Sequence, residues 1–85
     1  MTIHEQFQLA AVESKSLTEK PSNEILLQLY SFYKQGIEGD VDEDGPSNPF
    51  DFVGKAKYSA WSELKGMTKE AAMQKYIDLV NSLKG

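Results

Sequence analysis

Apolar residues recur along this chain at the three- and four-residue spacing of an α-helix, in segments bounded by residues that start or stop helices. In the first segment Phe7 and Ala10 share a face, and Thr2 is followed three residues later by Glu5, which is typical of a capping box. We therefore expect a first helix over residues 3–15.

A second helix is expected to follow directly. The segment Lys20-Pro21-Ser22-Asn23 predicts its start, because proline is tolerated in a first helical turn and serine and asparagine are good caps. The helix should run to about Gly36. Seven of the nine residues from Ile25 to Tyr33 are apolar or aromatic, more than the single stripe of a surface helix requires, so two of its faces should be covered.

The second half of the chain predicts a loop and two more helices. Residues 36–49 contain three glycines, two prolines and a group of acids, as loops do. Asp51 can cap a third helix that Lys65-Gly66 would end, with one face formed by Val53, Ala56, Lys57, Ala60, Trp61 and Leu64. Thr68 can cap a fourth helix, in which the helical period is kept most closely by Ala72, Met73, Tyr76, Ile77, Val80 and Leu83.

These elements predict an all-α fold in one domain over residues 1–85, because no segment alternates apolar and polar residues as a half-buried strand does. The short links within the first and the last helix pair favour antiparallel neighbours. The long loop allows the second and third helices to run parallel. An up-down-down-up four-helix bundle is therefore allowed.

Charge and composition restrict the function. The net charge of −4 and the isoelectric point near 4.8 argue against a nucleic-acid binder, whose binding face is normally basic. All nine basic residues are lysines, so an anionic partner would need a local lysine cluster. The chain has no cysteine, no basic segment leading into an apolar one at its start, and no apolar run long enough for a membrane span. We therefore expect a cytoplasmic protein.

Three aromatic and basic residues of the second helix form the first candidate site. Tyr30, Tyr33 and Lys34 lie at positions i, i+3 and i+4, which places two phenols and an ammonium on one side of a helix. Phenols and lysine can hold phosphate oxygens, and an exposed ring can stack a base. From spacing alone, however, packing in the core is the more common role of such a stripe.

The start of the third helix forms the second candidate site. The run from Phe52 to Trp61 contains Lys55 and Lys57 beside aromatic residues, at a helix end whose dipole favours anions. The alternative is a solvated helix face anchored in the core by Trp61.

An acidic motif in the loop partly matches a calcium-binding loop. Asp40, Asp42, Asp44 and Gly45 reproduce the opening of an EF-hand loop, and Asp51 stands at its twelfth position, where glutamate is usual. Two prolines interrupt the motif, so a solvated acidic loop is the preferred interpretation and no metal site is expected.

Catalysis finds little support in the sequence. The only histidine, His4, lies near one end of the chain, where helices fray, and no nucleophile has a visible base partner. We expect neither an enzyme nor a bound cofactor.

Several of these motifs together resemble the acyl-coenzyme A (acyl-CoA) binding protein family. The matching segments, in the order and spacing of the family, are Lys20-Pro21, Tyr30-Ser31-Phe32-Tyr33-Lys34-Gln35, Gly39-Asp40, the run from Asp51 to Trp61, Leu64-Lys65-Gly66, and Ala72-Met73 with Tyr76-Ile77. They cover almost the whole chain. The resemblance implies an up-down-down-up bundle that carries medium- and long-chain acyl-CoA esters reversibly in the cytosol, without catalysis.

The resemblance also implies eight ligand-binding residues. The 3′-phosphate of the nucleotide would be held by Tyr30, Lys34 and Lys57. Tyr33 would contact adenine, with further contacts from Tyr76 and Lys15, and the acyl chain would lie against Leu26 and Leu27. We expect a monomer whose partner is long-chain acyl-CoA, with transient contacts to enzymes that use it or to membranes.

Three departures from the family pattern bear on the ligand. The loop before Asp51 is one residue longer than usual and unusually acidic, Val53 stands where many members have lysine, and Tyr58 replaces a common tryptophan. The preferred acyl length therefore stays open. So do two alternative functions, a module whose second helix docks a partner helix and a calcium-binding loop.

Overall fold

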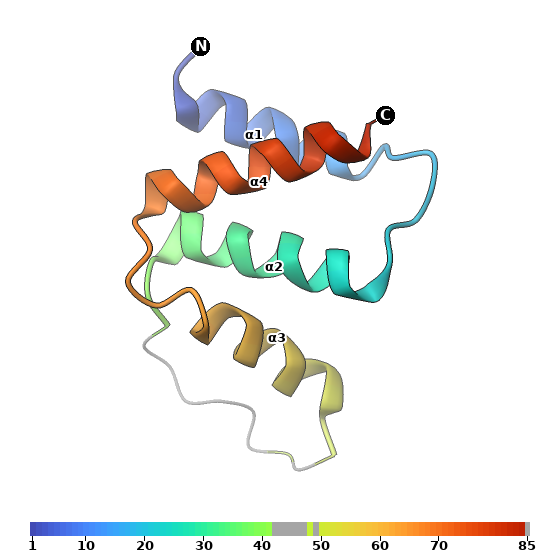
Figure 1. Ribbon diagram of the computed structural model, residues 1–85, viewed down its shortest axis with the longest axis vertical. Coiled ribbons are helices and arrows are strands. Elements are labelled where there is room, and N and C mark those ends of the chain that lie inside the picture. Colours follow the sequence, from blue (N-terminus) through green and yellow to red (C-terminus); the bar gives the residue numbers. More distant parts are fainter. Residues whose placement is uncertain (42–47, 49, 85) are drawn as a thin grey trace.

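The computed structural model describes residues 1–41, 48 and 50–84 of the chain. This part of the chain contains four α-helices. They are α1 (Ile3–Ser14), α2 (Asn23–Glu38), α3 (Phe52–Ser62) and α4 (Lys69–Leu83). Figure 1 shows α1 and α4 running in one direction and α2 and α3 in the opposite one. The predicted all-α, up-down-down-up arrangement is confirmed. Over these described residues no helix is both long and apolar enough to cross a membrane.

Every helix begins at a side-chain cap, as predicted. The Thr2 hydroxyl accepts a hydrogen bond from the Glu5 backbone N–H at 3.2 Å, and the reciprocal half of the capping box is also formed. Ser22, Asp51 and Thr68 accept equivalent bonds at the starts of α2, α3 and α4. Each cap satisfies one of the backbone donors that a helix leaves unpaired in its first turn.

The end of α2 differs from the prediction. The helix passes through Gly36 and ends two residues later at Glu38, followed by Gly39 with φ +80°. Gly36 is buried, and a Cβ atom there would lie 3.2 Å from side-chain atoms of both Phe7 and Met73. This glycine therefore permits close packing of three helices, whereas Gly39 supplies the positive φ at which the helix stops.

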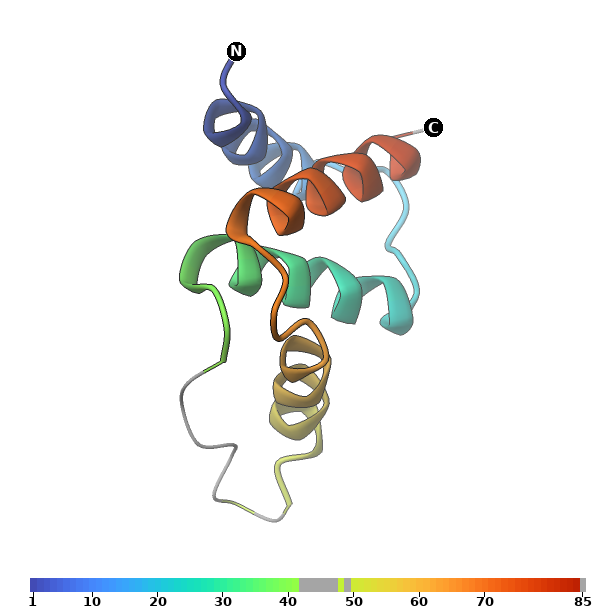
Figure 2. The same ribbon diagram turned by 60° about the vertical axis from the view of Figure 1, so that its left-hand side comes forward.

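The order of helices across the molecule corrects a second expectation. From top to bottom in Figure 1 the helices follow the order α1, α4, α2, α3, with direct packing of α1 on α4, α4 on α2 and α2 on α3; Figure 2 shows the same order from another side. The first and last helix pairs are antiparallel, as predicted, but their backbones do not pack directly on each other: α1 reaches α2 only through side chains such as Phe7, which contacts Tyr33. Link length limits where a helix can reach, but apolar faces decide what it packs against.

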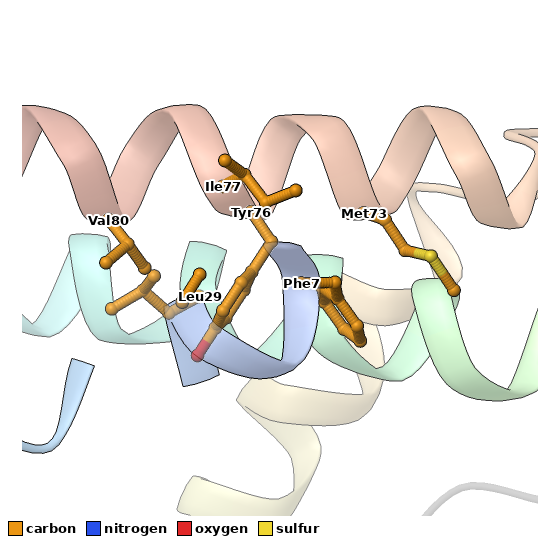
Figure 3. Close-up of a cluster of buried hydrophobic side chains, with 7 residues drawn as sticks. Phe7, Leu29, Met73, Tyr76, Ile77 and Val80 are labelled. Carbon is orange, nitrogen blue, oxygen red and sulfur yellow. The ribbon is translucent and has the colours of Figure 1, made fainter. Parts of the chain in front are cut away.

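The main core lies between α1, α2 and α4. Figure 3 shows side chains of these three helices meeting there, and the buried cluster consists of Phe7, Ala10, Leu29, Met73, Tyr76, Ile77 and Val80. The predicted apolar face of α4 is confirmed, and α2 is covered on two sides, by α4 and by α3. On α3 only Trp61 is buried, while Val53 of the predicted face is 67% exposed. The exposed start of α3 is therefore available to a ligand.

Candidate ligand-binding site

Tyr30 of α2 and Lys57 of α3 meet across the groove between their helices. The Lys57 Nζ atom lies 5.2 Å from the centroid of the Tyr30 ring, within the range of a cation–π contact. The two residues are far apart in sequence, and the packing of α3 on α2 brings them together. A phenol and an ammonium are thus presented side by side to solvent.

Lys34 is directed along α2 toward Glu38 and away from Tyr30. Its ammonium forms an ion pair with the Glu38 carboxylate one turn later and lies 4.9 Å from the centroid of the Trp61 ring. The indole of Trp61 is itself buried, and its Nε1–H donates to the Gly39 carbonyl at 2.9 Å. Lys34 therefore lies one turn from Tyr30 along the helix, but its ammonium is paired with the Glu38 carboxylate.

Tyr33 and Tyr76 form an aromatic cluster with Phe7, with ring centroids 5.1 to 5.7 Å apart. Tyr76 is only 5% exposed, and its hydroxyl donates to Ser14 Oγ at 3.2 Å. Tyr33 is 36% exposed and offers part of its ring to solvent. The ring of Tyr33 can therefore stack against a ligand, while the buried ring of Tyr76 packs against Tyr33 and presents little surface of its own.

Burial raises the pKa of the Tyr76 phenol above its ordinary value. The loss of hydration is the largest cause; the hydrogen bond to Ser14 opposes it, and the neighbouring Tyr33 adds to it. Burial disfavours the charged form of a phenol, so Tyr76 stays a neutral hydrogen-bond donor.

Two adjoining hollows lie beside these residues. The first, of about 220 Å³, is lined by Ser14, Leu17, Pro21, Leu26, Leu29, Tyr30, Tyr33 and Tyr76. The second, of about 380 Å³, is lined mainly by apolar side chains of α2 and α3: Asn23, Leu26, Leu27, Phe52, Val53, Ala56 and Lys57. Leu26 borders both. Apolar side chains therefore line the surface on both sides of Leu26, up to the exposed Phe52 and Val53 at the start of α3.

Lys15 lines a different hollow from Tyr30 and Lys57. It lines a third hollow of about 540 Å³ between α1, the end of α2 and the start of α4, together with Tyr33, His4, Phe7, Gln8, Ala11, Val12, Gly36, Ile37, Lys69 and Met73. Tyr33 borders both this hollow and the first one. Lys15 thus shares a hollow with one member of the predicted set, Tyr33, but does not line the hollows that Tyr30 and Lys57 line.

A polar cluster that the sequence analysis missed fixes the frame of this site. Gln35 is fully buried, and its Nε2 donates to Asp40 Oδ1 at 2.9 Å and to the Met67 carbonyl at 2.7 Å. The Gly66 N–H also donates to Asp40 Oδ1, at 2.8 Å. These bonds join the end of α2 to the turn after α3. A helical position with a polar residue gives no sign of burial in sequence, so only the tertiary contacts reveal the role of Gln35.

The calcium-like motif is engaged differently in the described residues. Asp40 accepts bonds from Gly66 and Gln35, which together with the nearby Lys65 hold the pKa of its carboxyl below the ordinary value. Asp51 caps α3. Asp42, Asp44 and Gly45 lie outside the described residues. Within the described part of the chain no three His, Cys, Asp or Glu side chains gather as metal ligands would.

Phenols and ammonium groups beside apolar hollows are the chemistry expected of a class of proteins that binds an amphipathic anion with an aromatic part. Similarity to known proteins identifies the family within this class. A sequence model described as "Acyl CoA binding protein" matches residues 4–80. The "Acyl-CoA-binding protein homolog" of Drosophila melanogaster is 47% identical over 81 residues, 95% of this chain and 93% of that protein. The solved structure of Oryza sativa Acyl-CoA-Binding Protein 2 superposes with a TM-score of 0.90 at 36% identity, covering 96% of this chain and 90% of that one.

The chain therefore belongs to the acyl-CoA-binding protein family, which confirms the family predicted from the motifs and its acyl-CoA-binding, carrier function. A longer relative, "Enoyl-CoA delta isomerase 2" of Rattus norvegicus, is 46% identical over 79 residues, which cover 93% of this chain but 20% of that protein. The match covers a small part of the isomerase and carries no isomerase activity over to this chain.

Proposed function

We propose that this protein binds medium- and long-chain acyl-CoA esters at the α2–α3 groove, with Tyr30, Lys34 and Lys57 holding the 3′-phosphate of the nucleotide. The observation that carries the proposal is the meeting of Lys57 with Tyr30 directly beside an apolar hollow. Hydrogen bonds from charged donors to phosphate are about twice as strong as neutral ones. The polar pair therefore fixes one end of the ligand, and the adjoining hollow receives the other.

Tyr33, Tyr76 and Lys15 complete the nucleotide end in this proposal. The partly exposed ring of Tyr33 stacks on adenine, for which a contribution of about 1–3 kcal/mol is usual. Lys15 lines a hollow that Tyr33 also borders, and in this proposal its ammonium binds a further phosphate oxygen. Tyr76 acts by holding Tyr33 in place, since its own hydroxyl is bonded to Ser14.

Leu26 and Leu27 receive the acyl chain, together with the apolar side chains at the start of α3. Each methylene removed from water contributes about 0.8 kcal/mol, which corresponds to roughly fourfold in affinity. Affinity should therefore rise steeply with acyl length until the chain outgrows the hollow, and free CoA should bind far more weakly than its long-chain esters.

The proposed mode of action is reversible sequestration without catalysis. Within the described residues the site offers phenols, ammonium groups and apolar side chains, which suit binding of phosphate, ring and chain. Chemistry on the ester is left to other enzymes. A monomeric state, a cytoplasmic location, and transient contacts with acyl-CoA-using enzymes or membranes belong to the same proposal, with residues 1–85 as one domain.

Calorimetric titration with palmitoyl-CoA, free CoA and free palmitate tests the proposal. Tight one-to-one binding of the ester, weak binding of CoA and little binding of palmitate are expected. Tight binding of palmitate with no binding of the ester would refute it. A stoichiometric protein partner recovered in the absence of any ester binding would instead select a helix-docking module.

A further inference from the structure

Glu38 carries a carboxylate beside the Lys34 ammonium, the group that the proposed function assigns to the ligand phosphate. It lies one turn after Lys34 on α2, and the two side chains form an ion pair. The Lys34 ammonium also lies over the ring of Trp61 at 4.9 Å. The Lys34 ammonium is thus paired with a carboxylate and directed away from Tyr30 and Lys57, where the proposed function places the phosphate.

Helix stability does not account for this carboxylate. Glu38 is the last residue of α2, where the negative end of the helix dipole disfavours an acid. A lysine that precedes a glutamate by four residues is also the less favourable order of such a pair. The unfavourable dipole and the modest attraction of an exposed pair have opposite signs, so replacing Glu38 with glutamine should leave the fold nearly unchanged.

The exposure of the pair lets it open. The side chain of Lys34 is 27% exposed and that of Glu38 is 43% exposed. Water can therefore hydrate the carboxylate when another anion pairs with the ammonium, and this exchange needs no rearrangement of α2.

We propose that Glu38 sets the affinity of the site by competing with the ligand phosphate for Lys34. The inference rests on the proposed function, because it takes Lys34 as a phosphate contact. When the ester binds, the phosphate displaces the carboxylate, and the two anions remain near each other. Glu38 lowers affinity through the nucleotide alone. Its effect is independent of acyl length, and it favours release of the ligand.

Glu38→Gln tests the inference, since the amide keeps the size of the side chain and removes its charge. Asp78→Asn is the matched control: it makes the same change in net charge on the exposed surface of α4, and the amide oxygen can still accept the bond from Gln74. Calorimetry at low salt measures binding of palmitoyl-CoA, CoA and 3′-dephospho-CoA. We expect Glu38→Gln to bind the first two about two- to fivefold more tightly, by similar factors. The gain for the dephospho compound should be smaller, and Asp78→Asn should match the wild type.

A double-mutant cycle with Lys34→Met separates competition at Lys34 from a general field effect. In the Lys34→Met background the gain from Glu38→Gln should fall to that of the control variant. A gain that persists there, or an equal gain for the dephospho compound, would overturn the inference. Weaker or unchanged binding by Glu38→Gln would also overturn it, showing that Glu38 orients Lys34 or is indifferent. If the wild type binds no ester, the proposed function fails and the inference with it; if the wild type binds and Glu38→Gln gains nothing, only the inference fails.

Discussion

Tyr30 and Tyr76 have the same side chain but occupy different environments. Tyr30 is partly exposed and lies under the ammonium of Lys57, whereas Tyr76 is 5% exposed and bonded to Ser14. A hydroxyl that faces a ligand contributes to affinity. A hydroxyl that is buried and hydrogen-bonded contributes to the free energy of unfolding, because its removal leaves a buried partner without that hydrogen bond.

Tyr30→Phe and Tyr76→Phe should therefore separate the two roles. We expect Tyr30→Phe to weaken ester binding several-fold with little change in the free energy of unfolding, as surface changes do. Tyr76→Phe should lower that free energy by about 1 kcal/mol and affect binding less. Urea denaturation and calorimetry on the same samples measure both quantities. Equal stability losses in the two variants would indicate that Tyr30 is a packing residue.

At the scale of helices, the sequence predicted existence and starts better than ends and neighbours. Thr2, Ser22, Asp51 and Thr68 cap the helices as expected, because a cap is a local interaction. The sequence places the end of the second helix at about Gly36 because a segment rich in glycine, proline and acids begins there. The contacts of Gly36 with Phe7 and Met73 come from other helices and leave no local signal.

The candidate site shows the same division. Tyr30, Tyr33 and Lys34 could be placed on one helix from their spacing, but spacing alone favoured packing for them. The contact of Lys57 with Tyr30 depends on how α3 packs on α2, and it was expected only through the family resemblance. Gln35 belongs to a matching motif, but its complete burial in the fold was not predicted.

The helix end at Gly39 yields a prediction at this scale. Gly39 has φ +80° and ψ −149°, a backbone region that is essentially restricted to glycine. An added Cβ would also lie 3.3 Å from Lys69 Cε. Gly39→Ala should lower the free energy of unfolding by about 1–3 kcal/mol. Thermal and urea denaturation measure the loss, and a variant as stable as the wild type would contradict this role.

At the scale of the whole molecule, the fold separates a core from a more loosely held element. The buried apolar cluster joins α1, α2 and α4, whereas α3 packs directly only on α2 among the described helices and buries little besides Trp61. The site is built across this division, because its polar pair and its apolar hollow both use residues of α3.

The attachment of α3 to a single neighbouring helix predicts two levels of protection against amide hydrogen exchange. Segments with few buried contacts open at a lower free energy than the core, so amides of α3 should exchange faster than those of α4 in the free protein. A ligand that touches α2 and α3 together closes that gap by binding only the ordered form. Hydrogen exchange with and without palmitoyl-CoA should show protection rising most in α3, and uniform protection of all four helices would contradict it. The amide exchange rate of α3 would then report the fraction of the protein that has ligand bound.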